Sequence, residues 1–269
     1  MSLREVFESR FGDPGTVDEI AELEAVAGRG SCRHFTDRSV PAGLVRALCA
    51  TALAAPSKSD LQQRDILVVT DSGIRRGIDA ACGQDWIAGA PVFLVFLANH
   101  RRQRRLADLH GLPFGNDHAD APFNAAMDAA IAMATCVAAA ERAGLGACPV
   151  STIRNRPEDV AGLLGLPDRV FPAMGLALGW PKFPPRISMR LPLAATVHEN
   201  RFDDAGEEDA VRAYSRARAA RQPFSAQRRV DEFGESADYG WSEDKARQYV
   251  HPDRAGWGAY LRRIGLSLT

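Results

Sequence analysis

The sequence predicts an α+β protein, because helix-forming segments and short apolar runs are interleaved without strict βαβ alternation. Three apolar runs, residues 66–69, 92–97 and 173–178, are bounded by turn residues and are too short for ordinary helices, so we expect buried strands. Residues 124–143 are mostly Ala, Met, Ile and Val, which predicts a helix covered on nearly all sides. Its small side chains would let another helix approach closely, for example in a dimer core.

Further helices are expected from their end signals. One starts at Thr16, where Glu19 would complete a capping box, and carries an apolar stripe in its following turns. Another covers residues 41–54, with its apolar side chains on one face and a proline soon after it. A third begins at an Asn155 cap, three residues before an acid, and stops at Gly165.

The chain is expected to form one main domain. Residues 1–15 are interpreted as an N-terminal extension and residues 16–269 as a single domain. From about residue 205 to residue 269 the chain is polar and Arg-rich, with too few apolar residues for an independent domain. We expect this part to be a C-terminal arm that wraps another surface.

Composition excludes several classes of protein. Hydrophobic residues make up 46% of the chain and charged residues 25%, with a net charge of -1, which is typical of a soluble globular protein. No basic half indicates a nucleic-acid surface, and the cationic run at residues 101–105 is interpreted as a solvated helix face. We expect no apolar stretch of the roughly 18 residues needed to cross a bilayer. No signal peptide is indicated at the N-terminus.

The five cysteines are scattered and form no CxxC pair, so neither a disulfide framework nor a zinc site is expected. They are interpreted as reduced thiols of a cytoplasmic protein. The nucleophile elbow, the phosphate-binding P-loop, the HExxH motif and a GxGxxG turn after a strand are all missing. His110, His118 and Asp120 have a spacing that matches no metal site.

Polar residues instead gather at the boundaries of the expected elements. Arg29, Ser31 and Arg33 lie between two helices and would suit a phosphate dianion, although surface salt bridges are an equal alternative. Residues 57–62 offer several hydrogen-bond donors for the edge of a heterocycle, or form an ordinary loop. Residues 144–155 either approach a flat ligand with their backbone amides or simply connect two helices.

Taken together and in order, these segments resemble the FMN-dependent nitroreductase family, and specifically its larger, NADPH-preferring, oxygen-insensitive branch. The resemblance runs from about Ala27 to Ile264. It rests on Ser31-Cys32-Arg33-His34-Phe35, Ala54-Ala55-Pro56-Ser57, Leu61-Gln62, Gly83-Gln84, Gly144-Leu145-Gly146, Ile153-Arg154-Asn155, Leu163-Leu164-Gly165-Leu166-Pro167, Gly175-Leu176-Ala177-Leu178-Gly179-Trp180-Pro181, Arg190-Leu191-Pro192 and Val197-His198-Glu199-Asn200.

The resemblance implies a mainly antiparallel central sheet flanked by helices, a homodimer, and an arm that wraps the partner subunit. It places Arg29, Ser31, Arg33 and Arg190 at the FMN phosphate. The implied flavin-binding set is Arg29, Gly30, Ser31, Cys32, Arg33, Ser57, Lys58, Ser59, Gln62, Gln84, Pro149, Val150, Ser151, Thr152, Ser188 and Arg190. Within this set the Ser151 backbone N–H would lie nearest flavin N5. Nicotinamide dinucleotide or acceptor binding is implied for Asp60, Arg218 and Arg254.

The sequence departs from the family pattern at several of these positions. Arg29-Gly30 stands where the family usually has His-Arg, and Ser188 stands where a Lys is expected, so the phosphate site has fewer cations. Ser151-Thr152 replaces Gly-Gly beside the ring. Asp60 occupies an aromatic or apolar lid position, which would shift the acceptor preference away from anions.

The implied activity is a ping-pong hydride transfer through FMN. The donor is NADPH, with NADH as the alternative, and the acceptors are nitroaromatics, quinones or related small molecules. No side-chain acid or base is then obligatory, which agrees with the missing catalytic motifs. Lys58 is a hypothetical stabiliser of the negative charge of reduced flavin near N1. The alternatives are flavin reduction, reductive dehalogenation or ene reduction on the same fold, a non-catalytic flavin-binding protein, or a ligand-free structural protein.

Overall fold

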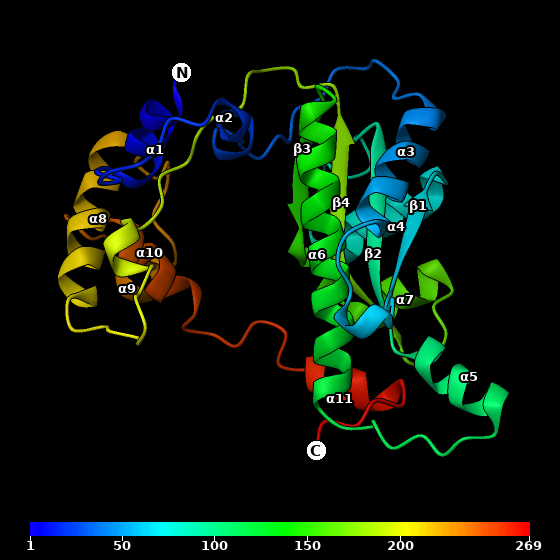
Figure 1. Cartoon of the computed structure of the whole chain (residues 1–269). Helices are drawn as coiled ribbons and strands as arrows, with labels where there is room; N and C mark the ends of the chain where they lie inside the picture. The colour runs from blue at the N-terminus through cyan, green and yellow to red at the C-terminus, as the bar shows by residue number, and fades with distance from the viewer. The chain divides into compact units, whose positions relative to one another are not determined.

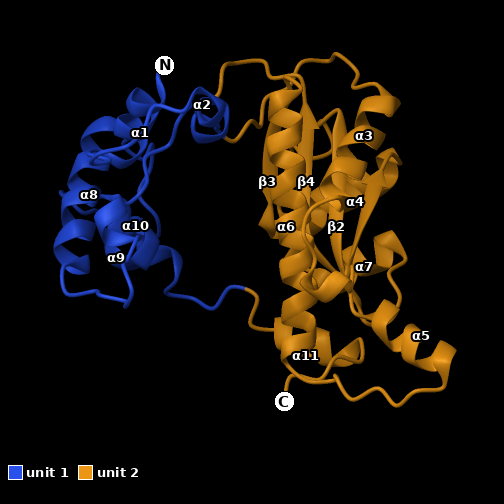
Figure 2. Ribbon diagram, viewed as in Figure 1, with its two compact units in different colours: residues 1–30, 186–253 blue, residues 31–185, 254–269 orange.

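The computed structural model describes residues 1–269, and the chain forms two compact units (Figure 2). Unit 1 consists of residues 1–30 and 186–253, and unit 2 of residues 31–185 and 254–269. The expected N-terminal extension and most of the expected C-terminal arm therefore lie in unit 1. That the arm wraps a partner subunit stays a prediction.

Unit 2 contains one antiparallel sheet of four strands in the order β1-β2-β4-β3. The strands are β1 (Arg64–Val69), β2 (Val92–Asn99), β3 (Gly146–Val150) and β4 (Val170–Gly179). All three predicted strands are confirmed, as is the α+β class with an antiparallel sheet. The prediction for residues 144–155 missed β3, because a five-residue strand that contains Gly and Pro carries little strand signal.

Helices surround this sheet (Figure 1). Unit 2 contains α3 (Ala42–Leu53), η1 (Lys58–Asp60), α4 (Ser72–Cys82), α5 (Arg101–His110), α6 (Asp120–Arg142), η2 (Ser151–Arg154), α7 (Pro157–Leu164) and α11 (Trp257–Arg263). Unit 1 is helical, with α1 (Leu3–Phe11), α2 (Ala21–Ala27), η3 (Leu193–Ala195), α8 (Glu207–Arg221), α9 (Val230–Phe233) and α10 (Trp241–Gln248). The cationic run at residues 101–105 lies on α5, as predicted.

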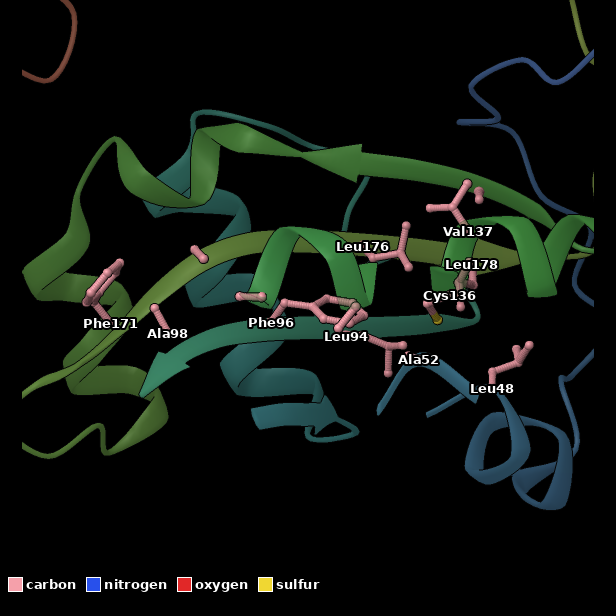
Figure 3. Packing of buried hydrophobic residues seen from close by; sticks show 14 of the residues in the cluster. Leu48, Ala52, Leu94, Phe96, Ala98, Cys136, Val137, Phe171, Leu176 and Leu178 are labelled. Atoms are coloured by element: carbon pink, nitrogen blue, oxygen red, sulfur yellow. The ribbon is translucent and has the colours of Figure 1, made fainter. Parts of the chain in front are cut away.

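Alternating residues of β2 separate the core of unit 2 into two layers, because successive side chains of a strand point to opposite faces. Leu94 and Phe96 pack with α3 and α6, whereas Phe93 and Val95 pack with α4 and α7. Figure 3 shows the first of these layers, with the sulfur of Cys136 among the aliphatic side chains. Every residue of β2 except the last is buried, which explains its continuous apolar sequence.

Helix α6 is covered on one side only within the chain. Its alanines and Cys136 pack on the sheet, whereas Phe123, Met127 and Ile131 are 62%, 46% and 39% exposed. By length and composition, this helix is long and apolar enough to cross a membrane, with a mean hydropathy of 1.5. The prediction that no apolar stretch has that length was therefore wrong. A core helix passes the same test, and α6 packs on β2, β4 and α3.

Two predicted helix starts are wrong. Helix α2 begins at Ala21 with Ile20 as an N-cap that makes no side-chain bond, and Glu19 instead accepts a hydrogen bond from the Arg4 backbone N–H. The capping box of this region belongs to α1, between Ser2 and Glu5. For α7 the N-cap is Arg156 rather than Asn155, because Pro157 takes the first helical position. The end of α7 at a left-handed Gly165 is confirmed.

Candidate functional site

The segment from Ser31 to Arg33 lies beside the edge strand β3. Ser31 forms a parallel bridge with Ala147, and the Cys32 N–H donates to the Ala147 carbonyl at 2.9 Å. A glycine is needed at position 146, because a Cβ there would lie 2.6 Å from the Cys32 Sγ. The fold therefore brings the first expected flavin segment against the strand that leads into the expected ring loop.

The expected ring loop, Pro149 to Thr152, is the end of β3 and the start of η2. Val150 is buried in the core, whereas Ser151 is exposed. No side chain caps this turn, so its first backbone N–H groups have no acceptor within the turn and can donate to a bound ligand.

Gln84 is tied to this loop through the end of α4. Burial raises the pKa of the Cys82 thiol, and a hydrogen bond with the Thr152 side chain opposes that rise. Gln84 follows after Gly83, which adopts a left-handed conformation, and its Oε1 accepts from the Trp86 indole N–H at 2.8 Å. This bond orients the Gln84 amide and leaves its NH₂ group to donate elsewhere.

The loop from residue 57 to residue 63 is organised by a buried carboxylate that sequence reasoning missed. Asp128 of α6 is 1% exposed, and it accepts from the Ser57 hydroxyl and from the backbone N–H groups of Lys58 and Gln63 at 3.0–3.1 Å. The buried guanidinium of Arg64 lies 3.7 Å from it. The sequence did carry a signal for this buried carboxylate, because Asp128 is a lone acid in an otherwise apolar stretch of the helix.

The same contacts revise the role of Ser57. The Ser57 hydroxyl donates to Asp128 and accepts from the Gln62 N–H at 2.8 Å. Its proton is therefore not available to a bound flavin. Ser59, Asp60 and Gln62 all have positive φ, which is unusual for residues other than glycine. This backbone leaves Lys58, Ser59 and Asp60 exposed on the outside of the loop.

In unit 1 the structure brings Arg29, Ser188 and Arg190 together around a third arginine. Arg10 of α1 is 8% exposed and donates to the carbonyls of Ala27, Arg29 and Ser188 at 2.7–3.1 Å. The Arg190 guanidinium donates to the Ser188 hydroxyl at 2.6 Å. Sequence reasoning missed Arg10, because it lies in a segment interpreted as an extension.

Gly30 lies at a close approach of two chain segments in unit 1. A Cβ at this position would lie 2.4 Å from the Arg186 carbonyl oxygen. The departure from the family pattern at Gly30 therefore matches the local backbone, which leaves no room for a side chain.

Arg218 of α8 lines a cavity of about 510 Å³ in unit 1, together with Arg10, Arg190, Tyr214 and Trp241. Its Nε is buried without a hydrogen-bond partner. Three guanidiniums and two aromatic rings therefore line this cavity, which would suit a phosphorylated or otherwise anionic planar ligand.

Arg254 lies in unit 2, where its Nε donates to the Asn155 side chain at 2.9 Å. Its charge also lowers the pKa of Arg154, although burial of Arg154 has the larger effect. Arg254 is therefore anchored at the start of α7. No group of three or more His, Cys, Asp or Glu side chains could hold a metal ion.

The residues present fit FMN in two respects. Arg10, Arg29 and Arg190 provide the positive charge that a phosphate dianion requires, and the exposed backbone of the ring loop offers donors to a heterocycle. The first feature suits an anionic ester and the second a flat, polar-edged ring.

Family models and known proteins match most of the chain. The model described as "Nitroreductase family" matches residues 26–180, and "Nitroreductase family, C-terminal domain" matches residues 188–269. An oxygen-insensitive NADPH nitroreductase of Salmonella typhimurium is 35% identical over 187 residues, which are 69% of this chain and 76% of the relative. An NADPH-flavin oxidoreductase of Vibrio harveyi is 30% identical over 253 residues, 91% of this chain and 98% of the relative.

The fold gives the same result. The structure of NfrA2 from B. megaterium superposes with a TM-score of 0.83 at 28% identity, covering 92% of this chain and 98% of the other. The NADPH:FMN oxidoreductase of Vibrio harveyi complexed with NAD+ gives a TM-score of 0.79 at 28% identity, covering 91% and 98%. The resemblance inferred from the ordered motifs is confirmed: the chain belongs to the nitroreductase family.

Proposed function

We propose that this protein is an FMN-dependent NAD(P)H oxidoreductase that reduces nitroaromatics, quinones or related electron-poor acceptors. The observation that carries the proposal is the convergence of Arg29 and Arg190, far apart in sequence, around the buried Arg10. Relatives named NADPH nitroreductase and FMN reductase support it.

The residues of this chain would bind and orient the cofactor. In unit 1, Arg29 and Arg190 would hold the phosphate. The backbone N–H groups at the start of η2 and the Gln84 amide would donate to the ring edge. When bound, FMN supplies the two-electron redox chemistry, so the protein needs no acid–base pair of its own. Ping-pong kinetics follow if donor and acceptor use the same face in turn.

Arg218 is proposed to recognise an anionic group of the donor. It lines the cavity in unit 1 and its Nε has no partner, so a 2′-phosphate of NADPH would satisfy it. A preference for NADPH over NADH that Arg218→Met abolishes would support this role.

We also propose that the protein is a homodimer in the cytoplasm. The exposed stripe of Phe123, Met127 and Ile131 on α6 is apolar and has no partner within the chain, so a second copy is proposed to cover it. None of the five cysteines forms a disulfide, which suits a reducing compartment. Sedimentation equilibrium at micromolar concentration tests the dimer, and a monomeric mass would contradict it.

The decisive experiment is anaerobic mixing of the purified yellow protein with NADPH and, separately, with NADH. The readout is the absorbance of the flavin band at about 450 nm. Bleaching by NADPH, followed by recovery on addition of a quinone or a nitroaromatic, is expected. Bound flavin that neither donor bleaches would favour the non-catalytic alternative. Colourless protein that takes up no FMN would refute the proposal.

A further inference from the structure

Helix α1 contributes a residue to unit 1 from outside both segments that match the family. These segments cover residues 26–180 and 188–269, whereas α1 spans Leu3–Phe11. Its last turn carries Arg10, which is only 8% exposed although arginine is rarely buried without a specific reason.

Arg10 connects two chain segments that are far apart in sequence, since its bond to Arg29 spans 19 positions and its bond to Ser188 spans 178. Nε and Nη2 donate to the Ala27 carbonyl at 3.0 and 2.7 Å, and Nη2 also donates to the Arg29 carbonyl at 2.7 Å. Nη1 donates to the Ser188 carbonyl at 3.1 Å. The Arg10 carbonyl in turn accepts from the Arg190 N–H at 2.6 Å.

Each of these segments carries one cation of the proposed phosphate site. Arg29 ends the first and Arg190 ends the second, so the Arg10 side chain fixes the backbone on which both guanidiniums are mounted. A planar guanidinium with donors in fixed directions suits this task, and a lysine ammonium could not reach all three carbonyls at once.

The neighbouring charges that act on Arg10 have the same sign as its own. Burial lowers the pKa of Arg10, and the neighbouring charges of Arg190 and Arg29 lower it further. Arg10 and Arg190 also line the same cavity. Holding the Arg10 and Arg190 charges close together costs free energy, and an anion that binds beside them would reduce that cost.

We propose that Arg10 is a positioning residue of the phosphate site, so that helix α1 makes this chain selective for a phosphorylated flavin. The inference rests on the proposed function, because it concerns the same FMN site. It also accounts for the two positions, Gly30 and Ser188, at which this chain has no expected cation: a buried arginine from helix α1 organises the cations that are left.

The test compares FMN with riboflavin, which differ only in the phosphate. Flavin-free protein is titrated with each compound and the quenching of flavin fluorescence gives both dissociation constants. Arg10→Met is expected to weaken FMN binding by about tenfold or more and to leave riboflavin binding nearly unchanged. Arg10→Lys, which keeps the charge but not the three bonds, is expected to lose part of the preference. Arg4→Met on the exposed side of the same helix is the matched control and should keep it.

An unchanged ratio of FMN to riboflavin affinity in Arg10→Met and Arg10→Lys would overturn the inference. An equal loss for both flavins would also overturn it, because Arg10 would then support only the fold of unit 1. If Arg10→Met does not fold, Arg10→Lys decides alone. Failure of the proposed function looks different, because the unmodified protein would then bind neither flavin.

Discussion

The two units contain contrasting buried charges. In unit 2 the carboxylate of Asp128 is surrounded by three hydrogen-bond donors and the guanidinium of Arg64. The Nη1 and Nη2 groups of Arg64 donate to the carbonyls of Leu53, Ala55 and Pro56. In unit 1 the guanidinium of Arg10 is satisfied by carbonyls, but the charges acting on it are those of Arg29 and Arg190.

This difference indicates that the two charge clusters have different roles, one in stability and one in ligand binding. A buried anion with a matching cation is complete without a ligand, so its role is to hold the 57–63 loop in its unusual backbone conformation. The charges that act on Arg10 have the same sign as its own, so a bound anion would be stabilised beside them. The first kind of cluster should therefore control stability, and the second affinity.

The largest expected effect is on stability, from Asp128→Asn. This change leaves the Arg64 charge buried without its counter-ion and turns an NH₂ group toward the Gln63 N–H. We expect a loss of about 3–5 kcal/mol in the free energy of unfolding, measured by urea denaturation. Asp120→Asn, at the exposed start of the same helix, is the control and should cost less than about 0.5 kcal/mol. A loss equal to the control would show that the buried pair does not hold the loop.

The next effect is on affinity, from Arg190→Met. Its guanidinium is exposed, so we expect little change in stability but a loss of about 10- to 100-fold in FMN affinity, measured by fluorescence titration. Arg212→Met, which breaks only an exposed pair with Glu208, should bind FMN normally. Normal FMN affinity in the Arg190 variant would remove the contrast between the two clusters.

A third prediction concerns a buried group that gains a positive charge as the pH falls. Burial lowers the pKa of His100 below its usual 6.5, with Arg169 acting in the same direction, and its Nδ1 has no hydrogen-bond partner. The unfolded chain therefore takes up the proton first. The burial of neutral His100 therefore makes a contribution to stability that depends on pH. This contribution is complete above pH 6.5 and is lost as the pH falls toward the lowered pKa of His100 in the folded protein.

Replacement by Gln should flatten this dependence. Thermal melts between about pH 5 and 7.5 are expected to show a loss of roughly 1 kcal/mol in the original protein that His100→Gln largely removes. An identical pH profile in both proteins would assign the loss to other groups.

The smallest effect is expected from Lys58→Met. Lys58 is exposed on the loop that Asp128 holds, and its charge would stabilise reduced flavin near N1. Its removal should lower the flavin midpoint potential by about 20 mV, since roughly 1 kcal/mol corresponds to that shift in a two-electron couple. Lys182→Met, at an exposed position after β4, is the control. An unchanged potential would rule out the stabilising role of Lys58.

The sequence predicted most elements that pack through a strong pattern. The strands β1, β2 and β4 and the helices α3 and α6 have continuous or periodic apolar residues, so local pattern and burial agree. Among the strands, the missed strand β3 pairs with β4 alone, and its identity depends on that partner. The cap at Thr16 failed because an acid at the right spacing can equally bond a distant backbone N–H, as Glu19 does with Arg4.

For the site, the sequence identified residue types but not their partners. Ser57 was interpreted as a ligand for the flavin, yet its hydroxyl is bonded to Asp128, 71 positions away. Arg10 carried no signal at all, because nothing local distinguishes a buried arginine from an exposed one. Long-range hydrogen bonds of this kind have no periodicity that a sequence could display.

The sequence by itself determined the family, the α+β class and the segments that carry polar residues, because these depend on composition, spacing and the order of motifs along the chain. Only the tertiary structure decided which charges are neutralised and which are left for a ligand. That distinction depends on distances between side chains from remote segments, and electrostatic energy varies with those distances rather than with separation along the chain.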